Sequence, residues 1–183
     1  ELDFGSVSGV ATVRITKAFY GPIVLPEVEV LGSSGTSLLN GSSVASQSSK
    51  IDCENCYRGI DASGSLVLDG DTNGNFNDGT VFHTMNQVDP WLRIDLGLTA
   101  TVSRVNIWNR TDCCWERLVG AKMQLLDSSG TILHTETVGS ISNSFFSFAP
   151  VKDVTAVLIS LENTAPTLIP LNLAEVEVFG TFQ

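Results

Sequence analysis

The chain has 183 residues, which is enough for one domain with a sizeable hydrophobic core and part of another. Hydrophobic residues make up 43% of the chain and charged residues 16%, a composition that argues against a disordered protein. The 20 acidic residues outnumber the 10 Lys and Arg, and the resulting net charge of -10 disfavours nucleic acids and anionic membranes as partners. The charge is compatible with a bound cation such as calcium, although an acidic soluble surface explains it without one and is the better interpretation of the charge alone.

Strand signals dominate the chain from start to end. Apolar or alternating segments, separated by Gly, Ser, Asn and Asp, occupy residues 10–16, 91–96, 102–108, 123–126, 154–161 and 173–179. Asp127-Ser128-Ser129-Gly130 predicts a hairpin turn between the apolar pairs at 125–126 and 132–133. Helical apolar stripes are lacking, and no apolar run approaches the ~18 residues of a membrane span. The sequence therefore predicts an all-β protein, an antiparallel β-sandwich or jelly roll, without membrane insertion.

The beginning of the chain repeats the end. Residues 27–32 match residues 175–180, and the strand-like residues 13–16 match residues 157–160 in the same order. We therefore expect residues 1–33 to be the last two strands of a preceding repeat and residues 34–183 to be one complete domain. Because two isolated strands are not stable alone, residues 1–33 either cover the domain's own sheet or complete a neighbouring copy, which would give head-to-tail filaments.

The four cysteines form two close pairs, Cys53 with Cys56 and Cys113 with Cys114. Adjacent cysteines do not chelate one tetrahedral ion comfortably, which disfavours zinc. An even number of cysteines in a chain rich in Ser, Thr and Gly favours short-range disulfides and an extracellular or cell-surface location. Four reduced thiols are the alternative, and the spacing alone does not fix the pairing.

The most informative segment is the loop at residues 109–117, where Arg110 precedes the cysteine pair and Arg117 follows it. Two guanidinium groups are costly to hold on one short loop unless something shares their charge. His83 lies upstream in a small polar motif. Guanidinium and imidazole groups suit the hydroxyls of a sugar, because the first carries five donors and the second can donate or accept. Taken singly, each arginine is better explained by a surface ion pair, so the combination is what indicates a sugar site.

Residues 34–183 resemble the F-type lectin (fucolectin) family, part of the discoidin-like, galactose-binding-like group of β-sandwiches. The landmarks that carry the resemblance occur in the family's order at residues 45–49, 68–71, 83–84, 90–96, 109–114, 116–118 and 175–178. The family's sugar motif is a histidine, then Arg-x-Asp, then a basic residue after four positions, and His83, Arg110, Asp112 and Arg117 fit it. The resemblance implies an eight-stranded jelly roll that contains calcium and binds terminal α-L-fucose, with fucosylated glycans as partners.

The resemblance also implies which residues contact the sugar: His83, Arg110, Asp112, Cys113, Cys114, Arg117 and Phe76. Asp112 would steady an arginine or orient the loop. Cys113 and Cys114 would form a disulfide that offers a polarisable face to the sugar. Cys53 and Cys56 depart from the family's pattern, and we expect them to form a local clip on the first loop instead. Phe76 would line the pocket or simply anchor its loop. Trp115 would add a stacking wall or pack in the core.

The calcium expectation depends on residues 69–75, an Asp/Asn/Gly loop that superficially resembles an EF-hand loop but has no flanking helix pattern and no terminal glutamate. In the resembled family the equivalent loop wraps one calcium ion. Carried over to this sequence, the ligands would be the Leu66 carbonyl, Asp69, Asp71, Thr80, the Ala174 carbonyl and Glu175. The alternative is a capped turn without a metal.

The sequence therefore predicts a calcium-containing carbohydrate-binding lectin domain, one unit of a tandem array. The alternative is a structural repeat of an extracellular filament or surface protein, assembled through its N-terminal strands and carrying a vestigial sugar site. We expect no enzyme activity, because the chain has only two histidines and neither a nucleophile elbow nor a paired-carboxylate motif.

Overall fold

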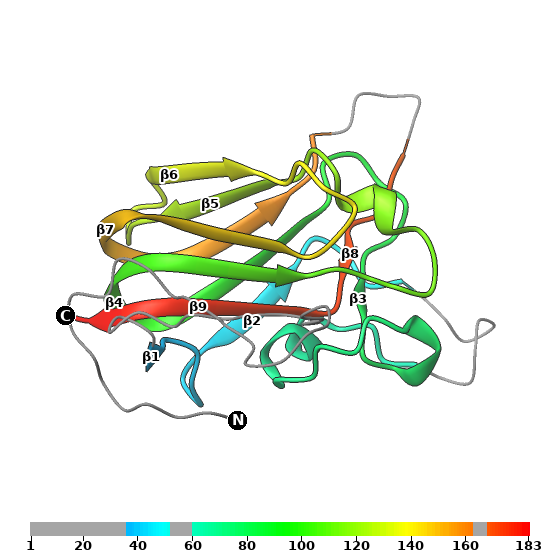
Figure 1. Ribbon diagram of the computed structural model, residues 1–183, viewed down its shortest axis with the longest axis horizontal. Coiled ribbons are helices and arrows are strands. Elements are labelled where there is room, and N and C mark those ends of the chain that lie inside the picture. The colour runs from blue at the N-terminus through cyan, green and yellow to red at the C-terminus, as the bar shows by residue number, and fades with distance from the viewer. Residues whose placement is uncertain (1–35, 52–59, 163–167) are drawn as a thin grey trace, which may run out of the picture.

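The computed structural model describes residues 36–51, 60–162 and 168–183. Within these ranges the chain consists of antiparallel strands and short 3-10 helices (Figure 1). The strands are β1 (Thr36–Ser37), β2 (Val44–Gln47), β3 (Phe82–His83), β4 (Trp91–Trp108), β5 (Lys122–Leu126), β6 (Ile132–Thr137), β7 (Ser144–Ser160), β8 (Asn172–Leu173) and β9 (Glu175–Phe182), and the helices are η1 (Gly64–Leu68), η2 (Phe76–Asp78) and η3 (Trp115–Leu118). The repeat expected in residues 1–33 and the expected Cys53–Cys56 clip lie outside the described residues. No helix in the described part of the chain has the length and apolar character required to cross a membrane.

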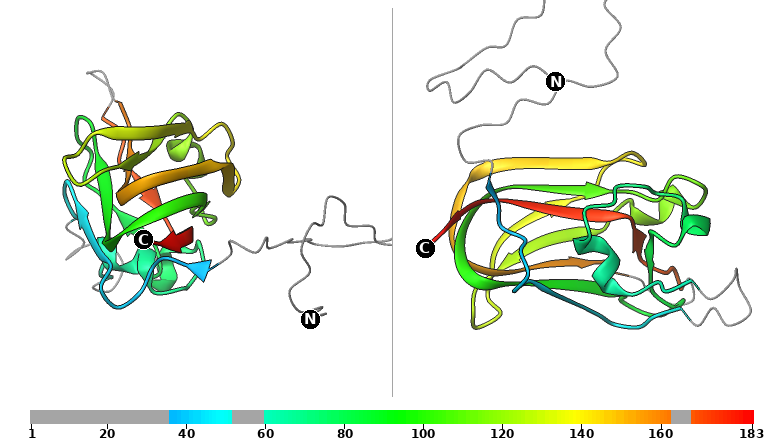
Figure 2. Two further views of the ribbon diagram at one scale, coloured as in Figure 1. Left: turned by 90° about the vertical axis from the view of Figure 1, so that its left-hand side faces the viewer. Right: turned by 90° about the horizontal axis from the view of Figure 1, so that it is seen from below.

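Two long bent strands, β4 and β7, fold one hydrogen-bonded sheet over on itself (Figure 2). The first half of β4 pairs with β2 and with the second half of β7, which continues to β5 and β6. The second half of β4 pairs with the first half of β7 and with β9, which continues to β1. Both layers of the predicted β-sandwich therefore share the same two strands.

Gly97 lies at the bend of β4 and has a φ of 81°. A Cβ at this position would also lie 2.8 Å from the Ser42 carbonyl oxygen, so a glycine suits the close crossing of the two segments. The register of β4 with β7 shifts between Asp95 and Ala100, shifts twice more before Arg104, and then runs regularly from Arg104 to Ile107. Residues 91–96 and 102–108, which we expected as separate strands, are consequently the two halves of β4, because pairing resumes after the bend.

The hairpin prediction is confirmed. Gly130 donates its backbone N–H to the Asp127 carbonyl at 3.0 Å, and β5 pairs antiparallel with β6 on either side of this turn. At the other end of the chain, Ala174 separates β8 from β9, so the expected strand at 173–179 is divided.

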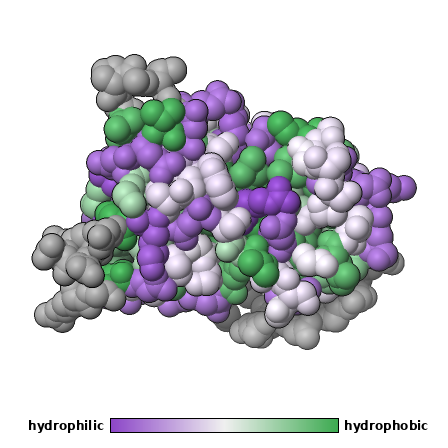
Figure 3. All heavy atoms as spheres, turned by 180° about the vertical axis from the view of Figure 1, so that it is seen from behind, coloured by the Kyte–Doolittle hydropathy of each residue, from purple (hydrophilic) through white to green (hydrophobic). Residues whose placement is uncertain are grey.

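The core lies between the two layers and is filled by the inward-facing side chains of the alternating strands. Burial of each large aliphatic side chain contributes roughly 1.5–3 kcal/mol. Fully buried members include Leu92, Ile94, Val105, Ile107, Met123, Leu125, Val157, Ile159, Val176 and Val178. On the back face of the sandwich, hydrophobic and hydrophilic groups are interspersed as small islands (Figure 3).

The loops gather at one end of the sandwich, with β3, β8 and the 3-10 helices (Figure 1). A second small apolar cluster, made of Ala62, Phe76, Val81 and Ala174, is buried there. This cluster packs the loop that carries Phe76 against the start of β9. The same end of the sandwich carries the motif formed by His83 and residues 110–117 (Figure 1).

Candidate functional site

The loop that follows β4 is anchored by Asn109, which is buried. Its side-chain amide donates to the backbone carbonyls of Trp115 at 2.9 Å and Ile141 at 3.0 Å, and its Oδ1 accepts the Arg110 N–H at 2.7 Å. The backbone N–H of Asn109 donates to Oδ1 of Asn143 at 2.9 Å. One side chain therefore holds both ends of the short segment that presents the two arginines and the two cysteines.

Arg110 and Asp112 form a two-pronged ion pair in this segment. The Arg110 Nε donates to Asp112 Oδ1 at 2.7 Å and its Nη2 donates to Oδ2 at 2.8 Å. The Arg110 guanidinium holds the pKa of Asp112 below its usual value. The pair takes two of the five N–H donors of Arg110, so three remain for another partner.

Phe76 lies beneath the two basic groups. The Arg110 guanidinium carbon is 4.5 Å from the centroid of the Phe76 ring, and the His83 ring meets the same phenyl edge to face at 5.6 Å. The backbone N–H of Phe76 also donates to Asp112 Oδ1 at 3.1 Å. Phe76 thus anchors its loop and orders the two basic groups that lie on its ring.

His83 is held as a neutral imidazole with a defined tautomer. Its Nδ1 is 2.6 Å from the Thr84 carbonyl, which can only accept, so Nδ1 carries the proton and Nε2 is an acceptor. Burial, together with the nearby charges of Arg110 and Arg117, lowers the pKa of His83 to about 4, although the hydrogen bond to the Thr84 carbonyl acts in the opposite direction. Arg117 Nη1 lies 3.4 Å from His83 Nε2, at the long end of the hydrogen-bond range.

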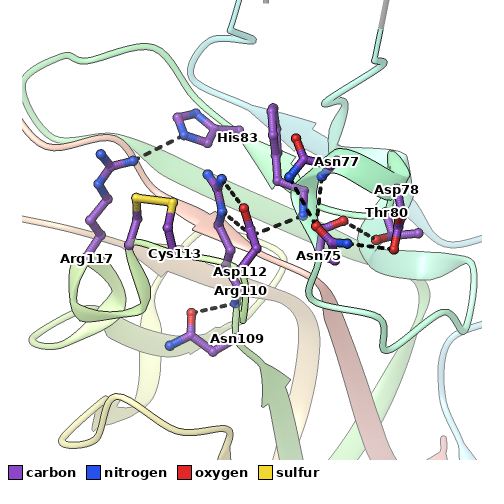
Figure 4. A network of polar contacts seen from close by, with 12 residues as sticks. Asn75, Asn77, Asp78, Thr80, His83, Asn109, Arg110, Asp112, Cys113 and Arg117 are labelled. Atoms are coloured by element: carbon purple, nitrogen blue, oxygen red, sulfur yellow. Dashed lines mark hydrogen bonds and ion pairs between the residues drawn. A yellow bond between two sulfur atoms is a disulfide. The ribbon is translucent and has the colours of Figure 1, made fainter. Parts of the chain in front are cut away.

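Cys113 and Cys114 form a disulfide in the structure, between neighbouring residues. Cys114 has a φ of 61°, in the left-handed region that residues with a side chain rarely adopt. The disulfide lies between the segments that carry Arg110 and Arg117 (Figure 4). The Trp115 side chain is at the surface and 41% exposed, which excludes the core position considered for it.

The structure brings the predicted sugar residues together from three parts of the chain: η2, β3 and the loop from 109 to 117 (Figure 4). They present guanidinium donors, one imidazole acceptor and the sulfur atoms of the disulfide, with the buried Phe76 ring beneath the two basic groups. This set can hold a small polyhydroxylated ring through hydrogen bonds and apolar contact.

The expected calcium residues lie in the loop after η1 and at the start of β9. Glu175 is buried, and its two carboxylate oxygens accept the backbone N–H groups of Gly70 at 2.9 Å and Val176 at 3.0 Å. Burial raises the pKa of Glu175 to about 8, and the two neighbouring charges that act on it, Asp69 and Glu177, are also negative. A buried carboxylate beside a second acidic group, in a loop rich in hard oxygen donors, fits a calcium ion.

Two details of the same loop bear on that fit. The Thr80 hydroxyl donates to the Asn73 carbonyl at 2.5 Å, and Asp71 accepts the Asn73 backbone N–H at 2.9 Å. Across residues 36–51, 60–162 and 168–183, no three His, Cys, Asp or Glu side chains gather in a group that could hold a metal. Any calcium ligand set here must therefore draw largely on backbone carbonyls, such as those of Leu66 and Ala174.

Several residues that shape the site were not predicted from the sequence. Asn109 holds the loop, and the Thr84 carbonyl fixes the His83 tautomer. Gly74 packs against the loop so closely that a Cβ there would lie 2.5 Å from the Asn109 carbonyl oxygen, and its own carbonyl accepts the Thr111 N–H at 2.8 Å. Thr84 and Asn109 lie in segments that carry the family resemblance, and Gly74 has a signal of its own, since a glycine in an Asp/Asn loop often marks close approach of two backbones.

Comparison with known proteins agrees with this geometry. A family model described as NedA-like, galactose-binding domain matches residues 66–157. The fucolectin of Anguilla anguilla is 41% identical over 61 residues, which are 33% of this chain and 39% of that protein, so this chain spans well under half of the relative's length.

Two solved structures extend the match to most of the domain. A Streptococcus pneumoniae fucose binding module, SpX-3, is 29% identical and has a TM-score of 0.68 over 81% of this chain and 99% of that chain. The f-lectin (fucolectin) from Morone saxatilis serum is 25% identical and has a TM-score of 0.65 over 81% of this chain and 48% of that chain.

The fold and the site together define a fucolectin-type β-sandwich domain. The chain belongs to the NedA-like, galactose-binding domain family.

Proposed function

We propose that this domain is a lectin that binds a terminal α-L-fucose of extracellular or cell-surface glycans. The observation that carries the proposal is the convergence of His83, Arg110 and Arg117 around the Cys113–Cys114 disulfide. Fucose-binding relatives share the fold over most of the domain, which supports the choice of sugar.

The three basic residues have different parts in this proposal. Arg117 donates to a ring or hydroxyl oxygen of the sugar, and a sugar hydroxyl donates to His83 Nε2, so that the ligand replaces the long contact of 3.4 Å between them. The Arg110 side chain is already oriented by Asp112 and Phe76. It therefore loses little conformational entropy when its remaining N–H donors bind the sugar. The disulfide covers the apolar edge of the sugar, while the buried Phe76 ring supports Arg110 and His83 from below.

We further propose that calcium occupies the loop beside Glu175 and has a structural role. Backbone carbonyl oxygens, such as those of Leu66 and Ala174, would supply most of its ligands, together with the Glu175 carboxylate and a side-chain oxygen of the loop such as that of Asp69. The ion would neutralise the buried Glu175 carboxylate and tie the loop to β9. Because the same loop continues into η2, its order determines where Phe76 lies beneath Arg110 and His83.

Isothermal titration calorimetry with methyl α-L-fucoside in the presence of calcium tests the sugar proposal. We expect Arg117→Gln and His83→Ala each to weaken binding at least about tenfold, which corresponds to the loss of about 1.4 kcal/mol. Arg93→Gln is the matched control, since Arg93 lies on β4 in a partly exposed pair with Asp95 and outside the site. Unchanged affinity in the two site variants, or no fucose binding by the unmodified chain, would exclude the proposal.

A second candidate function is that of a structural repeat. Residues 27–32 repeat the sequence of the first part of β9, and in the domain the end of β9 lies beside the start of β1, with Thr36 paired to Gly180. If a preceding copy ended at residue 33, only two residues would separate it from β1, which begins at Thr36. If the array is held by residues 1–33, analytical ultracentrifugation will show self-association of the full chain and a monomer after residues 1–33 are deleted.

A further inference from the structure

A hollow opens beside the candidate sugar site, on the far side of Arg117. Its volume is about 490 Å³, within the range of roughly 300–1,000 Å³ typical of pockets for small ligands. It is lined by η3, by the residues that follow η3 and by the two segments that flank the end of β7 and the start of β8. Arg117 is both a wall of this hollow and the partner of His83, so the hollow begins where the sugar site ends.

The lining combines apolar and polar groups. Leu161 and Pro170 of the lining are buried, and Leu168 and Val119 are exposed. Such aliphatic groups suit the C–H faces of a pyranose ring. Asn86 and Arg117 can donate hydrogen bonds there, while the two carboxylates of the lining, Glu116 and Glu162, can only accept when ionised.

We propose that this hollow is a second subsite, which receives the neutral hexopyranose unit bonded to the terminal sugar. This inference rests on the proposed function, because it assigns the terminal unit to the site formed by His83, Arg110 and Arg117. The carboxylates of Glu116 and Glu162 accept hydroxyl protons of the second unit and repel an anionic one. The subsite therefore selects neutral glycans over sulfated or sialylated glycans of the same backbone.

The shared arginine gives the two units a physical connection. A guanidinium is planar and carries donors on more than one edge, so Arg117 can serve the terminal sugar with one edge and the second unit with another. Glu116 lies on η3 and Glu162 follows the end of β7. Both segments therefore contribute to the selection of neutral over anionic glycans.

Calorimetry with three probes tests the proposal: methyl α-L-fucoside, a neutral fucosyl-galactose disaccharide and its galactose-sulfated counterpart. We expect the neutral disaccharide to bind about five- to tenfold more tightly than the monosaccharide, and the sulfated one to lose that gain. Glu116→Gln combined with Glu162→Gln should restore sulfated binding several-fold and leave the monosaccharide unchanged. Glu136→Gln, on β6, is the matched control, because Glu136 pairs with His134 and is not part of the lining.

The outcomes separate this inference from the proposed function. Monosaccharide binding without any gain from the second unit would overturn the subsite and leave the terminal-sugar site intact. An unchanged preference for the neutral disaccharide in the double variant would overturn the role of the two carboxylates. As a second readout, methyl NMR signals of Leu168 should shift on addition of the disaccharide but not of the monosaccharide, and a failure to shift would contradict the placement.

Discussion

Arg117 Nη1 and His83 Nε2 face each other at 3.4 Å, although the residues lie on η3 and β3. The His83 Nδ1 proton is committed to the Thr84 carbonyl, so Nε2 has a lone pair directed at a cation. A protonated His83 would face Arg117 with a like charge and would have no lone pair there. The neutral state of one imidazole is therefore a condition for both the local packing and the proposed sugar contact.

The first prediction concerns pH. The pKa of His83 is lowered from 6.5 to about 4 in the folded chain, so the unfolded chain binds the proton more readily. The stability associated with the neutral imidazole is thus fully present above pH 6.5 and is lost as the pH falls from 6.5 towards 4, by about 2–3 kcal/mol. Urea unfolding across this range will measure the loss. His83→Gln should flatten it, whereas an equally steep profile in that variant would assign the effect to other groups.

The second prediction compares two Arg–Asp pairs. In the Arg110–Asp112 pair the side chains are 9% and 18% exposed, and in the Arg93–Asp95 pair they are 33% and 46% exposed. Asp112→Asn leaves a largely buried guanidinium without its counter-charge and should lower the free energy of unfolding by about 2–4 kcal/mol. Asp95→Asn should cost at most about 1 kcal/mol, because water screens that pair. Urea titration of the two variants at pH 7 decides the matter, and equal losses would contradict the structural distinction.

The third prediction concerns the neighbouring cysteines. Their disulfide closes almost no chain loop, so its entropic effect on the unfolded state is small. Replacing both Cys113 and Cys114 by Ser should therefore leave the melting temperature within a few degrees and weaken fucose binding about tenfold. Calorimetry and thermal melting of the same sample measure both quantities. Strong destabilisation with unchanged affinity would assign the disulfide a purely structural role.

The fourth prediction concerns the proposed calcium ion. An ion that binds only the folded chain raises its stability in proportion to the logarithm of the free ion concentration, by about 2.7 kcal/mol at a hundredfold excess over Kd. Addition of a chelator should therefore lower the melting temperature by several degrees, and calcium should restore it while magnesium does not. In Glu175→Gln the dependence on calcium should disappear. A melting curve that is indifferent to chelator in the unmodified chain would remove calcium from the proposal.

The fifth prediction uses two glycines. A Cβ at Gly74 would lie 2.5 Å from the Asn109 carbonyl oxygen, whereas at Gly41 it would meet nothing within 4 Å. Gly74→Ala should therefore separate the two loops and cost about 1–3 kcal/mol of unfolding free energy, along with much of the sugar affinity. Gly41→Ala should leave both quantities nearly unchanged. Wild-type affinity in Gly74→Ala would show that the loop contact is dispensable for the site.

The sequence alone was informative wherever the signal was local. Alternating apolar residues indicated most of the strands, and the Asp127–Gly130 turn indicated the hairpin that the structure contains. Arg110 and Asp112, two positions apart on one loop, form the pair that their spacing allowed. Such patterns are readable because strand periodicity and turn chemistry depend on residues that are neighbours in the chain.

The sequence did not determine the relations between distant segments. It gave no sign that β4 continues through the bend at Gly97, that Asn109 anchors its loop through Ile141, or that a hollow adjoins Arg117. The sequence indicated which basic residues and cysteines belong to the site. Only the packing of β3, η2 and the loop after β4 brings His83 against Phe76 and beside Arg117. These relations depend on strand register and on how a bent sheet closes on itself, and both are set by the burial of the whole core rather than by any local run of residues.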